Sequence, residues 1–238
     1  MRKSFGTLLG IALVSLFSLA KAATYPLPGW SFSGSGFGSW SGSSSDPTMV
    51  FFFVFGPSSG SGLVERAFAT SSTNILTINS NTIYTLTCSS MLTGPGDAGM
   101  TLIANGVASY DVNVPSSVPW TNYSTSFTTS GPSDPRVGAP LLAQCHAGAG
   151  VMGGANVTFT NITLNVSLLL PKLTILRTNL AQVRLSWSTN FNWYALESAT
   201  NINSSWLPVT NASSVQGSEL VVNVDLSQAR SFFRLRQP

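Results

Sequence analysis

The sequence has few charged residues, with 11 Lys and Arg and 8 Asp and Glu among 238 residues. Three of the basic residues, Arg2, Lys3 and Lys21, lie within the first 22 positions. Subtracting these three from 11 leaves 8 basic residues against 8 acidic ones, so the rest of the chain is about neutral. Nucleic acid binding needs clustered Lys and Arg that displace counterions from phosphates. Because no such cluster is present, we expect no nucleic acid partner.

The first 22 residues have the pattern of a secretory signal peptide. Arg2 and Lys3 precede an apolar run from Leu8 to Ala20, and Ala20-Lys21-Ala22 forms a small-x-small cleavage site. The run is shorter than the roughly 20 apolar residues that span a bilayer. We therefore expect a signal peptide at 1–22 and a secreted or cell-surface protein, with a retained signal anchor as the alternative. The remaining chain has no second apolar run of that length, which predicts no membrane span in the mature protein.

Long segments with a helical period near 3.6 residues are also missing. Short β-branched and aromatic runs are instead separated by Gly, Pro, Asn and Ser, which indicates strands and turns. The sequence predicts an all-β protein with an N-terminal jelly-roll-type β-sandwich over 23–168 and a small antiparallel β-sandwich over 172–238, divided near Pro171. Strands of the first domain are expected at 49–55, 74–78, 82–89, 100–104, 108–112, 123–128, 140–145 and 156–166.

Three local features of the first domain are specific enough to test. The continuous apolar run from Met49 to Phe55 predicts a strand buried on both faces. Asn105-Gly106 predicts a hairpin turn. Val157 and Phe159 share one strand phase and Ile162 to Val166 the other, so we expect a β-bulge near Thr160-Asn161.

The chain contains two cysteines, Cys88 and Cys145, and one histidine, His146. Strand alternation places both cysteines inward, and export to an oxidising compartment favours a disulfide between them over two buried thiols. His146 lies in the opposite strand phase to Cys145. No CxxC or HxxxH spacing supports a metal site. We expect a surface or loop histidine and no metal.

Catalytic motifs are nearly absent. No Gly-x-Ser-x-Gly elbow surrounds a serine, and the few carboxylates fit turns and solvated strand faces. We expect no enzyme. Six Asn-x-Ser/Thr sequons begin at Asn122, Asn156, Asn161, Asn165, Asn203 and Asn211; composition alone can generate them, and glycosylation would require a eukaryotic source.

Aromatic residues are the remaining ligand-binding candidates. Trp30, Trp40, Trp120 and Tyr123 lie in loop-like or Gly/Pro-flanked contexts. The apolar faces of sugar rings stack on aromatic side chains, and amides hydrogen-bond sugar hydroxyls. The alternative for each ring is that it fills the sandwich core or its edges.

Three segments carry a first resemblance: NTIYTLT (81–87), VGAPL (137–141) and VTFTNITL (157–164). Together they resemble strand signatures of bacterial jelly-roll domains of the carbohydrate-binding-module, galactose-binding-like type. The resemblance implies a glycan ligand. In this family acidic positions contribute to a structural calcium site. Because Thr160 stands where the family usually has Asp, we expect no cofactor, with a structural calcium ion as the alternative.

A second resemblance rests on VRLSW (183–187), YALES (194–198), Trp206 and FFRL (232–235). These elements are similar to a fibronectin type III-like C-terminal module of secreted environmental-bacterial proteins. Across its strands, Glu197 is expected to pair with Arg184 or Arg234.

The sequence thus predicts a secreted, non-catalytic protein that recognises a polysaccharide or cell-surface glycan. The alternative is a structural or adhesive extracellular component with no small-molecule ligand.

Overall fold

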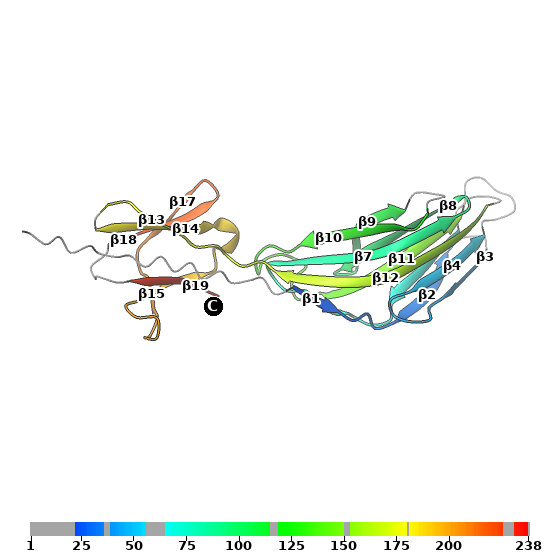
Figure 1. Cartoon of the computed structure of the whole chain (residues 1–238), viewed down its shortest axis with the longest axis horizontal. Helices are drawn as coiled ribbons and strands as arrows, with labels where there is room; N and C mark the ends of the chain where they lie inside the picture. Colours follow the sequence, from blue (N-terminus) through cyan, green and yellow to red (C-terminus); the bar gives the residue numbers. More distant parts are fainter. Residues whose placement is uncertain are drawn as a thin grey trace, which may run out of the picture. The chain divides into compact units, whose positions relative to one another are not determined.

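The computed structural model describes residues 22–35, 39–55, 65–114, 119–149, 153–179, 181–225 and 231–237, without the side chains of 35, 39–40, 65 and 107–114. Residues 1–21 of the expected signal peptide lie outside this part of the chain. The chain divides after Leu169 into an N-terminal and a C-terminal unit. Strands connected by turns form both units, so the protein is all-β, as predicted (Figure 1).

The N-terminal unit contains two antiparallel sheets. We call the first sheet A; its strand order is β10 (Thr121–Thr128), β7 (Thr82–Thr93), β12 (Gly154–Leu168), β4 (Val50–Phe55) and β3 (Ser39–Ser43), and β1 (Ala22–Tyr25) also pairs with β12. We call the second sheet B; its order is β2 (Trp30–Ser35), β5 (Glu65–Ser71), β11 (Pro140–Ala149), β8 (Gly96–Ala104) and β9 (Val107–Val114), with β6 (Leu76–Thr77) on β11.

One hydrophobic core joins sheets A and B into a sandwich. Strand β7 shows the alternation that builds it, because every second residue from Thr82 to Leu92 is buried. Inward side chains of β4, β7 and β12 meet those of β5, β8 and β11 in a single cluster. The Asn105-Gly106 turn forms the predicted hairpin between β8 and β9, and both residues have positive φ, 54° and 72°.

The predicted β-bulge in β12 is confirmed. The register of β12 on β7 shifts between Thr160 and Thr163, and Asn161 has a φ of 53°. On its other side β12 pairs with β4 before the bulge and with β1 after it. The bulge therefore lies where β12 changes partner along that edge.

The prediction for Met49 to Phe55 is wrong in one respect. The segment forms strand β4, but only Val50, Phe52 and Val54 are buried, whereas Phe53 and Phe55 are 42% and 43% exposed. A continuous apolar run does not distinguish a strand buried on both faces from one with aromatic side chains on its outer face.

The predicted disulfide is not formed, because Cys88 and Cys145 are free thiols. Both point into the core, as strand alternation predicted. Cys88 belongs to β7 in sheet A and Cys145 to β11 in sheet B. Each thiol lies among apolar core side chains, where it is accommodated as a small hydrophobic group.

The C-terminal unit is a smaller sandwich. One sheet has the order β13 (Thr174–Arg177), β14 (Gln182–Ser188), β18 (Glu219–Asp225) and β17 (Ser213–Gln216); the other has β16 (Leu207–Pro208), β15 (Ala195–Ala199) and β19 (Phe232–Arg236). A short 3₁₀ turn, η1 (Thr189–Phe191), follows β14. Residues of both sheets, including Leu185, Val222 and Leu196, share one core.

Glu197 pairs across the strands with Arg234, which confirms one of the two partners predicted for it. The two side chains approach to 2.7 Å, and Arg234 also lies 4.3 Å from the ring centre of Trp206. This arrangement ties β15, β19 and the segment before β16 together.

In the part of the chain that the structure describes, no helix has the length and apolar character needed to cross a membrane.

Candidate functional site

The outer face of sheet A carries no charge at its described positions. The outward residues of β4, β7, β10 and β12 are all Phe, Ser, Thr, Asn, Met, Ile or Gly. Hydroxyl and amide groups bond to one another across the strands: Thr87 to Thr163 at 2.7 Å, Ser89 to Asn122 at 2.6 Å and Thr24 to Asn165 at 2.9 Å. This face therefore offers hydrogen bonds but no ionic contact.

At one end of this face three phenylalanines follow one another along β4. Phe51, Phe53 and Phe55 occupy alternate, outward positions about 7 Å apart. Small or polar residues of both neighbouring strands flank them: Ser43 and Ser41 on β3, and Thr158, Asn156 and Gly154 on β12. The arrangement is an exposed row of rings with polar groups on both sides.

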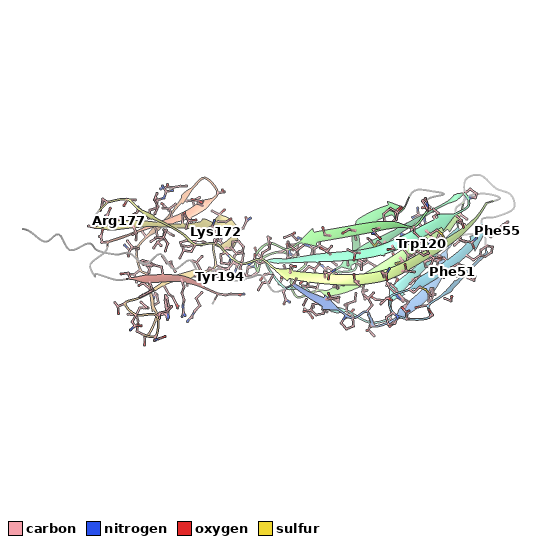
Figure 2. The ribbon with its side chains drawn as sticks, in the orientation of Figure 1. Phe51, Phe55, Trp120, Lys172, Arg177 and Tyr194 are labelled. Atoms are coloured by element: carbon pink, nitrogen blue, oxygen red, sulfur yellow. The ribbon has the colours of Figure 1, made fainter. Side chains whose placement is uncertain are left out.

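A second apolar group lies beyond Asn156 and Thr158. Met91 of β7 pairs with Thr158, and Trp120, which is 50% exposed, comes directly before β10. Continuing the β10–β7 register from Thr121 and Ser90 places Trp120 beside Met91. Figure 2 shows Phe51, Phe55 and Trp120 at the same end of the N-terminal unit. We call Phe51, Phe53, Phe55, Met91 and Trp120 the aromatic patch.

The four aromatic residues singled out from the sequence have different places in the structure. Trp120 belongs to the aromatic patch. Trp30 and Tyr123 are partly buried against the core, and the indole Nε1 of Trp30 donates to the carbonyl of Pro47 at 3.0 Å. Trp40 lies on β3 with its backbone paired to Val54, and its side chain is outside the described part of the chain.

Phe51, Phe53 and Phe55 were missed as site residues. The signal that could have found them is their alternate spacing, because a strand of a two-layer sandwich turns every second side chain away from the core. The prediction of a strand buried on both faces concealed this signal.

His146 is not the surface or loop residue that the sequence predicted. It lies in the middle of β11 on the outer face of sheet B, in the opposite phase to Cys145, and is only 5% exposed. Its ring centre is 6.3 Å from that of Phe68 on the neighbouring strand β5.

Two kinds of reactive group can be checked in the described part of the chain, clustered metal ligands and cysteine thiols. Among the described residues, no three His, Cys, Asp or Glu side chains gather where they could hold a metal ion. Burial raises the pKa of the Cys88 thiol to about 12 and that of Cys145 well above its usual range. Neither thiol ionises near neutral pH, and the thiolate is the reactive form.

Comparison with known proteins gives structural neighbours only. No family model matches the chain, and no curated protein matches it. A cyclase from Fischerella sp. TAU is 14% identical, with 61% of this chain and 98% of that one covered and a TM-score of 0.41. A structure from a study of carbohydrate-binding modules of the β-sandwich superfamily is 11% identical, with coverage of 58% and 57% and a TM-score of 0.37. A family 29 carbohydrate-binding module solved with mannohexaose is 10% identical, with coverage of 61% and 92% and a TM-score of 0.33. Proteins with a β-sandwich fold have many unrelated functions, so a function has to be inferred from the residues of the site.

Proposed function

We propose that this is a secreted, non-catalytic protein that binds a neutral glycan on the aromatic patch of its N-terminal unit. The observation that carries the proposal is the exposure of Phe53, Phe55 and Trp120, at 42%, 43% and 50%, on a sheet face without charge. Exposed apolar groups gathered on a polar face are typical of interaction sites.

The chemistry of the patch fits sugar rings. A pyranose has an apolar face that packs on an aromatic ring and hydroxyls around its edge that need hydrogen-bonding partners. Asn156 and Thr158 lie between the phenylalanine row and Met91, where an amide and a hydroxyl can meet such an edge. Charged polysaccharides would leave their ionic groups without a counter-charge here, which favours a neutral chain.

A structural or adhesive role is the second candidate, and the same exposed rings are the observation that favours it. In that case the aromatic patch would bury itself against a second copy of the protein rather than a sugar.

A glycan array probed with the mature protein, together with light scattering over a range of concentrations, separates the two. Binding to neutral glycans by a monomeric protein supports the proposal, and this binding should be lost in Phe53→Ser and Phe55→Ser. Val215→Ser is the matched control, since Val215 is an exposed apolar residue of the C-terminal unit. The absence of a glycan signal, together with concentration-dependent assembly, would overturn the glycan assignment in favour of the structural role.

A further inference from the structure

The rings of the aromatic patch project further from sheet A than the described side chains beside them. Phe53 lies between Ser41 on β3 and Asn156 on β12, and Phe55 lies beside Gly154 on β12. Serine and asparagine are shorter than phenylalanine, and glycine has no side chain. Phe53 and Phe55 accordingly remain 42% and 43% exposed. These neighbours leave the rings standing above the face of the sheet and do not enclose them in a groove.

The aromatic patch extends in two directions. Along β4, Phe55 is four positions after Phe51, which corresponds to about 14 Å in a strand. Across the sheet, Phe51 and Trp120 are separated by three strand spacings, from β4 over β12 and β7 to β10, which is again about 14 Å. Figure 2 labels the three residues that mark these directions. Because the patch is as wide as it is long, it presents an area and not a single line of contacts.

Polar groups between the two apolar sides of the patch are available to a ligand. Asn156 and Thr158 lie between the phenylalanine row and Met91, and their side chains make no hydrogen bond to another described residue. Further along the same face the hydroxyls bond to each other, as Thr163 and Thr87 do at 2.7 Å. The patch therefore combines exposed rings with an amide and a hydroxyl that have not been used within the fold.

An open area of this kind favours a rigid partner. A small ligand in a concave site has most of its surface buried, whereas a single soluble chain on this face would contact the protein with one side only. Such a chain would also lose conformational freedom on binding, which lowers its affinity. Chains that are packed in an ordered solid have already lost that freedom. They also lie side by side, so their common surface can cover the patch in both directions.

We propose that the aromatic patch recognises the surface of an ordered, insoluble neutral polysaccharide in preference to a single soluble chain of the same sugar. This inference rests on the proposed function, since it names the physical form of the glycan that the patch binds. One chain of that surface packs on the phenylalanine row, and a neighbouring chain packs on Trp120. Asn156 and Thr158 hydrogen-bond to hydroxyls between them. Phe55 and Trp120, at opposite corners of the patch, therefore both contact the ligand.

The test compares solid and soluble forms of the same sugar. The full mature chain is mixed with suspended microcrystalline cellulose, chitin or insoluble mannan, and the protein that remains in solution is measured. Isothermal titration with cellohexaose, N-acetylchitohexaose and mannohexaose gives the affinity for a single chain of each sugar. We expect at least one solid to bind with a dissociation constant at least tenfold below that of its own hexasaccharide. Phe55→Ser and Trp120→Ala should each weaken binding to that solid at least tenfold. Val215→Ser, at an exposed apolar residue of the C-terminal unit, should leave it unchanged.

The outcomes separate this inference from the proposed function. A hexasaccharide that binds as tightly as its solid would overturn the inference and leave the glycan assignment intact. Full binding to the solid in either Phe55→Ser or Trp120→Ala would also overturn it, because the contact would then follow one line. Thermal unfolding checks that both variants fold, and the comparison of solid with hexasaccharide needs no variant. A protein that binds glycans on an array but none of the three solids would contradict only the inference, whereas one that binds neither would contradict both.

Discussion

The ring of Phe55 lies over Gly154 of the neighbouring strand. A Cβ atom on Gly154 would come within 3.0 Å of Cδ2 and 3.4 Å of Cε2 of that ring. Phe55 is nevertheless 43% exposed, so the glycine supports one side of the ring and leaves the other side open. The absence of a side chain at Gly154 therefore sets the position of one ring of the aromatic patch.

Substitution of this glycine should displace the ring. In Gly154→Val the new side chain occupies the position of the Phe55 ring, and we expect retention by a neutral polysaccharide in affinity electrophoresis to fall at least several-fold. Stability should change by no more than about 1 kcal/mol, because valine suits a strand and the ring can move toward solvent. Ser126→Val adds the same side chain elsewhere on this face and is the control. Unchanged retention in Gly154→Val would show that Phe55 does not contact the ligand.

Binding at the aromatic patch should not depend on salt. The described outward positions of sheet A have no charge, so there is no ionic attraction for salt to screen. We expect the dissociation constant for a neutral polysaccharide to stay within about twofold between roughly 0.05 and 1 M NaCl, a range over which the Debye length shrinks severalfold. Isothermal titration at both concentrations measures it. A steep loss of affinity in high salt would instead point to an ionic site.

The two thiols should resist modification until the protein unfolds. Burial holds the pKa of Cys88 at about 12 and raises that of Cys145 as well. Because protonated thiols are favoured in the folded state, their contribution to stability is complete below the unfolded pKa of about 8.5 and is lost as the pH rises toward 12. At pH 8 we expect no alkylation by iodoacetamide without denaturant and two modified cysteines in denaturant, as seen by mass spectrometry. Rapid modification of the native protein would contradict the buried placement.

Much of this architecture could be predicted from the sequence. Strand alternation gave the inward phase of Cys88 and Cys145, and the phase change along β12 located the bulge at Asn161. These features depend on local periodicity, which can be read directly from the order of the residues. The site depends on which strands become neighbours. The residues around Phe53 in the sequence do not predict that Asn156 will lie beside it. Likewise, the residues around Arg66 do not predict that it will reach Asp97 across Gly148.

The turn after β10 should make the protein sensitive to acid. Asp134 is buried and accepts hydrogen bonds from the backbone of Ser130 and from the guanidinium of Arg136, at 2.6 Å from Nη2. The Arg136 hydrogen bond holds the pKa of Asp134 well below its usual range. Its stabilisation is therefore present above the unfolded pKa of about 3.9 and is lost as the pH falls below it.

The measurement is urea unfolding of the native protein and of Asp134→Asn at pH 7 and pH 3. At pH 7 we expect the variant to lose about 3 kcal/mol, the scale for breaking a buried ion pair. At pH 3 the difference should be smaller, because the native carboxylate begins to lose its advantage there. A difference that is the same at both pH values would show that the charge of Asp134 contributes nothing.

A comparison of two tryptophans tests whether the exposed rings of sheet A bind a glycan. Trp120 is 50% exposed, whereas Trp30 packs against the core and donates to Pro47. We expect Trp120→Ala to weaken polysaccharide binding at least tenfold, or about 1.4 kcal/mol, with an unchanged melting temperature. Trp30→Ala should lower the stability by about 2 kcal/mol or more and leave the affinity of the folded protein intact. Full affinity in Trp120→Ala would show that the aromatic patch is not the glycan-binding site.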